Sequence, residues 1–105
     1  MEDLKKLLGI KIKNLRIKRG YSQQQLAEII NIDQRNLSNI ECGNTFPTKS
    51  LLKISKVLNV SLPELFDFDY IPKNIDEMKN FIVKNIENMN DKDIITIYRM
   101  VKVMQ

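Results

Sequence analysis

Five polar side chains within one stretch of eight residues, 34–41, have functional groups that can read nucleic-acid bases. They are Gln34, Arg35, Asn36, Ser38 and Asn39. Gln and Asn can bond adenine through two atoms at once, and Arg can do the same with O6 and N7 of guanine. The alternative is a plain solvated helix face. Because short amide residues are poor helix formers and such a face usually carries Glu, Lys and Ala, recognition is the favoured interpretation.

The composition excludes most catalytic chemistry. The chain has 105 residues, no His and one cysteine, Cys42, which rules out a zinc finger, a Cys–His or Ser–His–Asp catalytic set and an intramolecular disulfide. Three Gly offer little material for a deep, loop-lined pocket. We therefore expect no enzymatic activity, cofactor, metal or small-molecule ligand. Cys42 could be a redox switch, but a partly buried, small apolar residue is the interpretation we favour.

Charge is distributed unevenly along the chain. The net charge is +4, but residues 1–60 carry eleven Lys and Arg against five Asp and Glu, whereas residues 61–105 carry six against eight. The amino-terminal part is thus the candidate for binding an anionic partner. The free cysteine, the lack of a signal peptide and the lack of an apolar run near the roughly 18 residues of a membrane span predict a soluble, cytoplasmic protein.

Apolar residues recur at helical spacing, and the expected fold class is all-α. We predict a five-helix domain at residues 1–70 and two amphipathic helices in residues 71–105, with residues 67–72 as a linker. The first five helices are expected at 4–19, 23–31, 34–41, from Pro47 or Thr48 to Asn59, and after Ser61. Gly20, Asn31 and Gly43 are suited to the left-handed conformation that ends a helix.

Residues 22–43 predict two short helices joined by a tight turn. Their sequence is S-Q-Q-Q-L-A-E-I-I-N-I-D-Q-R-N-L-S-N-I-E-C-G. Ser22 and Gln25 form a capping box pattern, and the small Ala27 lets the second helix approach the first. The buried side of the first helix is predicted to comprise Leu26, Ala27, Ile29 and Ile30. This unit is a helix-turn-helix, whose second helix fits the major groove of B-DNA.

From about Leu8 to Phe66 the sequence resembles the phage repressor/Cro (XRE-like) family of helix-turn-helix transcriptional regulators. The similar segments are L-G-I-K-I-K-N-L-R, R-G-Y-S-Q-Q-Q-L-A, the turn with its second helix, I-E-C-G, and L-L-K-I-S-K-V-L-N-V-S-L-P-E-L-F. Two positions depart from the family pattern: Asn31 stands where Gly is usual, and Ser55 where Ala is usual. Asn tolerates a positive φ, so the turn is still expected.

The resemblance implies a role for each polar residue. Gln34, Arg35 and Asn39 occupy base-reading positions, flanked by Asn36 and Ser38. Gln23 is similar to a Gln that reaches a phosphate and braces the recognition helix; the alternative is a solvated first-turn residue. The resemblance also implies a structural salt bridge between Arg16 and Glu41 rather than two DNA contacts. Further phosphate contacts are expected from the rim, at Ser22, Asn44, Thr45, Thr48 and Lys49, with Lys18 or Arg19 as additional candidates.

The carboxy-terminal helices, in residues 74–105, carry apolar stripes that these 32 residues cannot bury alone. They must pack on the first domain, on another chain, or on both. Since one recognition helix reads only a few base pairs, we expect a two-fold homodimer on a pseudo-palindromic operator. The residues predicted to form the dimer contact are Ile82, Ile86, Ile94, Ile97, Tyr98, Val101 and Met104.

The function expected from these patterns is sequence-specific binding of double-stranded DNA by a transcriptional regulator that represses. The resemblance implies a bacterial or phage-encoded, nucleoid-associated protein. The alternative is a protein-interaction helix-turn-helix module, antitoxin-like or a regulator's binding partner, in which DNA binding is secondary. Such a module should carry apolar residues at Gln34, Arg35, Asn36 and Asn39, where this chain is polar.

Overall fold

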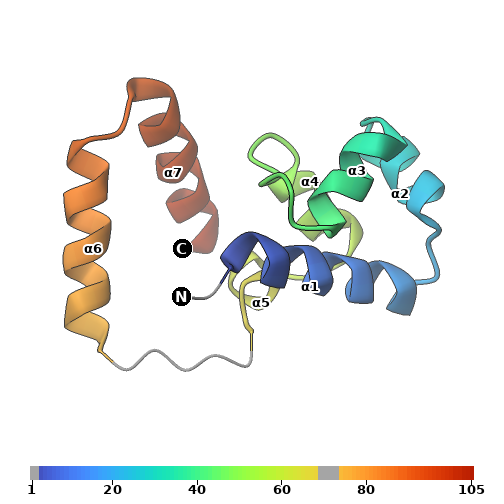
Figure 1. Cartoon of the computed structure of the whole chain (residues 1–105), viewed down its shortest axis with the longest axis horizontal. Coiled ribbons are helices and arrows are strands. Elements are labelled where there is room, and N and C mark those ends of the chain that lie inside the picture. Colours follow the sequence, from blue (N-terminus) through green and yellow to red (C-terminus); the bar gives the residue numbers. More distant parts are fainter. Residues whose placement is uncertain (1–2, 69–73) are drawn as a thin grey trace. The chain divides into compact units, whose positions relative to one another are not determined.

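The computed structural model describes residues 3–68 and 74–105, and these ranges contain seven helices and no strand (Figure 1). The helices are α1 (Leu4–Lys18), α2 (Gln23–Ile29), α3 (Gln34–Glu41), α4 (Leu51–Val57), α5 (Leu62–Leu65), α6 (Ile75–Glu87) and α7 (Asp91–Met104). The chain divides into two compact units, residues 1–68 and 69–105. The all-α fold class is thus confirmed. Of the predicted linker, only Asp67 and Phe68 belong to the described residues.

Four helices end in the same backbone motif, in which the residue after the cap has a positive φ. These residues are Gly20 (82°), Asn31 (59°), Gly43 (80°) and Asn59 (58°). After α2, the N–H of Ile32 donates to the carbonyl of Ala27 at 2.9 Å, and that of Asn31 donates to Glu28 at 3.2 Å. This pair of bonds is the Schellman motif, and it satisfies carbonyls that the helix would otherwise leave free. Asn31 makes the turn between α2 and α3 as predicted.

Side-chain caps begin most of the helices. The Ser22 hydroxyl oxygen accepts from the N–H of Gln25 at 3.0 Å, while the Gln25 side chain accepts from the N–H of Ser22 at 2.8 Å. The capping box is therefore present. The predicted start of α4 at Pro47 or Thr48 is wrong, because residues 48–50 form a turn and the helix begins at Leu51. The N–H of Ser50 donates to the carbonyl of Pro47, three residues earlier. The α-helical pattern, in which each N–H donates to the carbonyl four residues earlier, begins with the bond from the N–H of Ile54 to the carbonyl of Ser50.

The core of the first unit is formed by apolar residues of α1 to α5. Its buried members are Leu8, Ile12, Leu26, Ala27, Ile30, Leu37, Ile40, Leu51, Ile54, Leu58, Leu62 and Leu65. The prediction that Ile29 is buried is wrong, since its exposed fraction is 52%. Leu26, Ala27 and Ile30 form the inward face of α2, and Ile29 lies about 100° round the helix from the centre of that face.

One close contact between backbones sets the packing of α1 on α3. A Cβ atom added at Gly9 of α1 would lie 2.5 Å from the Ile40 carbonyl oxygen and 2.6 Å from that of Glu41. A Cβ at Gly43, just after α3, would lie 2.5 Å from Cγ and 2.7 Å from Cα of Lys6. Two glycines therefore let the carboxyl end of the recognition helix approach α1 more closely than side chains would permit.

The second unit consists of α6 and α7, which are capped by the side chains of Asn74 and Asn90. Neither helix has a fully buried residue. The half-buried residues are Asn85, Ile86, Ile94, Thr96, Ile97 and Met100. Large apolar side chains on both helices are exposed, among them Phe81, Ile82, Tyr98 and Val101. No helix in the described part of the chain has the length and apolar character needed to cross a membrane.

Candidate nucleic-acid interface

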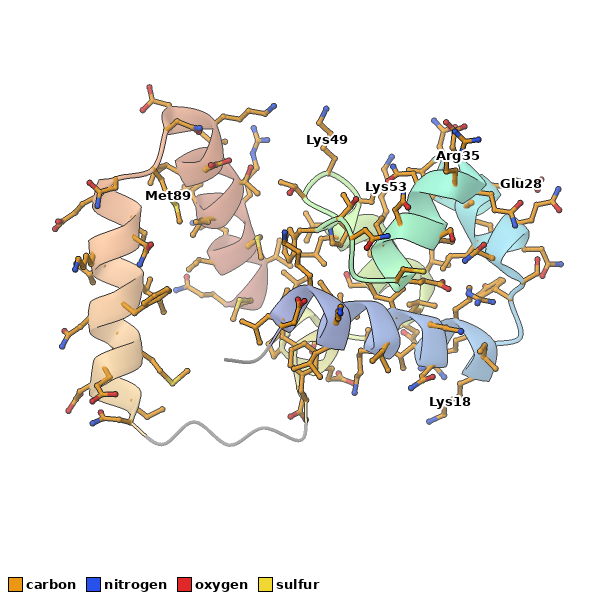
Figure 2. The ribbon with its side chains drawn as sticks, in the orientation of Figure 1. Lys18, Glu28, Arg35, Lys49, Lys53 and Met89 are labelled. Carbon is orange, nitrogen blue, oxygen red and sulfur yellow. The ribbon has the colours of Figure 1, made fainter. Side chains whose placement is uncertain are left out.

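The recognition helix α3 is anchored along one side and free on the other. Leu37, Ile40 and Glu41 are buried against the first unit. Gln34, Arg35 and Asn36, at the amino-terminal end, are exposed, whereas Ser38 and Asn39 are half-buried. The five residues predicted to contact bases thus lie on one short helix, with the long polar side chains at its open end, and Figure 2 shows Arg35 at the edge of the unit. That is the presentation a groove-reading helix needs.

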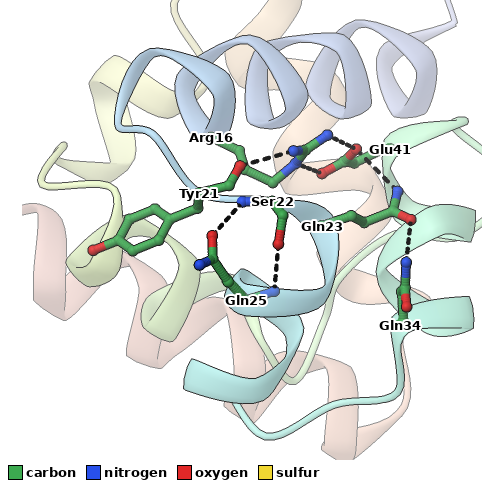
Figure 3. Close-up of polar contacts among 7 residues, drawn as sticks. All are labelled: Arg16, Tyr21, Ser22, Gln23, Gln25, Gln34 and Glu41. Atoms are coloured by element: carbon green, nitrogen blue, oxygen red, sulfur yellow. Dashed lines mark hydrogen bonds and ion pairs between the residues drawn. The ribbon is translucent and has the colours of Figure 1, made fainter.

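Arg16 and Glu41 form a buried ion pair that joins α1 to the end of α3 (Figure 3). Arg16 Nε lies 2.8 Å from Glu41 Oε2, and Arg16 Nη2 donates to Glu41 Oε1 at 3.1 Å. Arg16 Nη1 also donates to the carbonyl of Tyr21 at 2.9 Å. The exposed fractions of the two side chains are only 10% and 3%. A buried, bidentate ion pair of this kind fixes the recognition helix and leaves neither charge free for DNA.

Two glutamines extend this ion pair to the free surface of α3 (Figure 3). Gln23 Nε2 donates to Glu41 Oε1 at 3.2 Å, and Gln34 Nε2 donates to Gln23 Oε1 at 3.4 Å. The half-buried Gln23 therefore braces the recognition helix, and its contact with a phosphate remains a prediction. The path Arg16–Glu41–Gln23–Gln34 restricts the orientation of Gln34, the first residue of α3.

The loop after α3 exposes the residues predicted to contact phosphates. Asn44, Thr45, Thr48 and Lys49 are all exposed, while the intervening Pro47 is buried. Phe46 is half-buried and its ring centre lies 6.4 Å from that of Phe66. The apolar side chains of Phe46 and Pro47 therefore pack against the rest of the first unit, while the polar side chains of the loop are exposed to solvent. Ser22, the remaining predicted phosphate contact, is exposed but already caps α2.

The structure separates the basic side chains of the first unit by face. Figure 2 shows Lys49 and Lys53 on the same side as Arg35, and Lys18 on the opposite side. Arg19 Nε donates to the Leu58 carbonyl at 2.8 Å and so ties α1 to the end of α4. Lys18 therefore lies on a different side of the unit from Arg35. Lys53, an exposed residue in the first turn of α4, is not among the phosphate contacts predicted from the sequence.

The prediction that Cys42 is partly buried is wrong, because the free thiol is exposed. Cys42 is the C-cap residue of α3 and follows the buried Glu41. The next position lies about 100° further round the helix, which turns it away from the core.

Known proteins similar to this chain are regulators with the same motif. The sequence profile of the helix-turn-helix family matches residues 12–65. The HTH-type transcriptional regulator ImmR of Bacillus subtilis (strain 168) is 38% identical over 89 residues, which cover 82% of this chain and 70% of that protein. The SPbeta prophage-derived uncharacterized HTH-type transcriptional regulator YonR of the same organism is 32% identical over 75 residues, covering 70% and 69%.

A third relative has a more specific name. The competence pilus inhibition repressor of Acinetobacter baylyi (strain ATCC 33305 / BD413 / ADP1) is 30% identical over 76 residues, which cover 71% of this chain and 66% of that protein. The match to the family profile spans the α2–turn–α3 segment and the positions of Arg16 and Glu41. The chain therefore belongs to the XRE-like family of helix-turn-helix transcriptional regulators, which are non-enzymatic DNA-binding proteins.

Proposed function

We propose that this protein binds a specific double-stranded DNA operator, reads it in the major groove with α3, and represses transcription. The observation that carries the proposal is the placement of Gln34, Arg35 and Asn36, which are exposed at the open end of a helix whose other side is buried. Amide and guanidinium groups can each bond a base edge through two atoms. A protein-interaction module should instead expose apolar residues on this face, so DNA is the favoured partner.

The hydrogen-bond network around Glu41 supports reading by a rigid helix. Glu41 receives hydrogen bonds from both Arg16 and Gln23, and Gln23 in turn receives one from Gln34. Side chains fixed before binding lose less conformational entropy when they bond a base. Gln34 is therefore proposed as a contact that is oriented in advance, whereas Arg35, which extends freely, adjusts to its base.

Phosphate contacts are proposed along the rim of α3. The exposed residues Asn44, Thr45, Thr48 and Lys49 follow the recognition helix, and Ser22 and Gln23 begin α2 beside it. To these we add Lys53, which lies on the same side as Arg35 in Figure 2. Such contacts fix the position of the helix on the duplex and carry no sequence information themselves.

Repression and dimerisation are the remaining parts of the proposal. The similar Acinetobacter protein is named as a repressor, which supports that direction of regulation. The second unit is proposed as the oligomerisation segment of a homodimer on a pseudo-palindromic operator. Of the predicted contact residues, Ile82, Tyr98, Val101 and Met104 are exposed, whereas Ile86, Ile94 and Ile97 are half-buried. The exposed four are accessible to a second chain.

Selection of bound sequences from random DNA, at one fixed salt concentration, tests the proposed function. We expect an enriched motif of two inverted half-sites whose centres are about one helical turn, roughly 10 base pairs, apart. Gln34→Ala and Arg35→Ala should each relax the preference at one base pair per half-site, because each loses a bidentate contact worth about 1–3 kcal/mol.

The matched control is Lys49→Ala, which removes a rim cation from the same face. It should weaken binding to all sequences alike and leave the selected motif unchanged, because a phosphate contact reads no base. Failure of the parent protein to enrich any motif would contradict sequence-specific binding.

A further inference from the structure

One face of helix α7 carries a stripe of four exposed residues. Only one of them, Tyr98, is among the residues predicted to form the dimer contact. Asp91, Ile95, Tyr98 and Lys102 follow one another at intervals of four, three and four residues, so they lie within about 60° on one face of the helix. All four are exposed, and the exposed fractions of Ile95 and Tyr98 are 47% and 61%. The half-buried Ile97 lies on another face.

The order of residue types along this stripe is acid, apolar, apolar, base. If a second copy of α7 runs antiparallel, with the two-fold axis midway between Thr96 and Ile97, the spacing brings Asp91 opposite Lys102 and Ile95 opposite Tyr98 of the other chain. Each contact then occurs twice, which is the property of a self-complementary two-fold interface. A parallel pairing would instead place Asp91 against Asp91 and Lys102 against Lys102, where like charges repel.

One further feature favours the antiparallel arrangement. The acidic end of the stripe lies in the first turn of α7 and the basic end in its last turn, so antiparallel helices also bring opposite ends of their dipoles together. Within each chain, Lys102 Nζ lies 6.0 Å from the centre of the Tyr98 ring, which keeps the ammonium group alongside the stripe.

We propose that α7 forms the two-fold contact of the homodimer by pairing antiparallel with α7 of a second copy, through Asp91, Ile95, Tyr98 and Lys102. This inference rests on the dimer of the proposed function and adds its surface and its helix orientation. Asp91, Ile95 and Lys102 become contact residues that the apolar pattern alone does not identify.

Charge reversal in the full-length chain tests the proposal, with the dimer measured by sedimentation equilibrium at low salt and without DNA. Asp91→Lys and Lys102→Glu should each raise the dimer dissociation constant at least about tenfold, since two exposed attractions become two repulsions. The double variant Asp91→Lys/Lys102→Glu should dimerise as the parent does. An equimolar mixture of the two single variants should also dimerise as strongly as the parent, because both charge pairs between positions 91 and 102 are attractive in the mixed dimer.

The matched control is Asp93→Lys, which makes the same charge change in the first turn of α7 but on the opposite face of the helix. It should leave dimerisation unchanged, and circular dichroism of every variant verifies that the helices form. A dimer in Asp91→Lys as strong as in the parent, or a double variant that stays as weak as the single ones, would overturn the proposal.

The affinity for a single half-site, measured in parallel, separates this proposal from the proposed function. All of the α7 variants should retain the parent's half-site affinity, because α3 is untouched. If the single variants dimerise weakly and the double variant recovers, but the protein selects no DNA motif, the proposed function is rejected and the α7 interface stands. A selected, symmetric motif in a protein whose dimer ignores the charge reversals would do the opposite.

Discussion

Replacing Arg16 with Ala is expected to lower the free energy of unfolding by about 3–5 kcal/mol, because it leaves the carboxylate of Glu41 buried without its cation. The Glu41 side chain is only 3% exposed, and the remaining donor to it is Gln23 at 3.2 Å. The variant also loses the bond from Arg16 to the Tyr21 carbonyl, which holds the chain between α1 and α2. Urea denaturation followed by circular dichroism measures the change.

The matched control replaces both partners of the ion pair. Arg16→Met/Glu41→Leu should recover most of the lost stability, because apolar side chains of similar volume need no compensation when buried. If Arg16→Ala instead melted like the parent and lost only DNA binding, Arg16 would be a DNA contact and the structural assignment would be wrong.

The substitution Gly9→Ala is expected to destabilise the protein by about 2–3 kcal/mol, although Ala in place of Gly normally stabilises the interior of a helix. The new methyl group would lie 2.5 Å from the Ile40 carbonyl oxygen and 2.6 Å from that of Glu41. Both neighbours are backbone atoms, so no change of rotamer can relieve the overlap and α3 must move away from α1. Thermal or urea unfolding gives the sign directly.

Asn14→Ala is the control for Gly9→Ala, because Asn14 is an exposed residue of the same helix. It should be neutral or slightly stabilising, since only helix propensity changes there. Gly9→Ala should also weaken DNA binding, because the displaced α3 carries the reading residues. Equal, small gains in stability for the two variants would mean that α1 and α3 do not approach as closely as described.

Local signals in the sequence predict the parts of the fold that depend on single residues. Asn31 takes the left-handed conformation in the turn, and Ser22 with Gln25 forms the capping box, because each depends only on its immediate neighbours. The ion pair of Arg16 and Glu41 spans 25 residues and is implied only by the family resemblance. Helical spacing alone does not pair two charges so far apart.

Features that depend on contacts between helices were either not predicted from the sequence or predicted incorrectly. Gly9 reads as an ordinary interior glycine, and only the position of α3 shows that the backbone needs that space. Ile29 is apolar yet exposed, because the core contacts a narrow face of α2. The stripe of α7 mixes charged and apolar residues, so a search for apolar periodicity finds only Tyr98 of its four members.

The central claim is that α3 reads base edges in the major groove, and base analogues in the selected operator test it most directly. Replacing the guanine assigned to Arg35 with 7-deazaguanine removes one acceptor in the major groove, whereas inosine removes only the amino group in the minor groove. The measurement is the dissociation constant of the parent and of Arg35→Ala on each DNA. We predict that 7-deazaguanine weakens the parent about tenfold, inosine has little effect, and Arg35→Ala is insensitive to both. A parent weakened by inosine and unaffected by 7-deazaguanine would contradict major-groove reading by this helix.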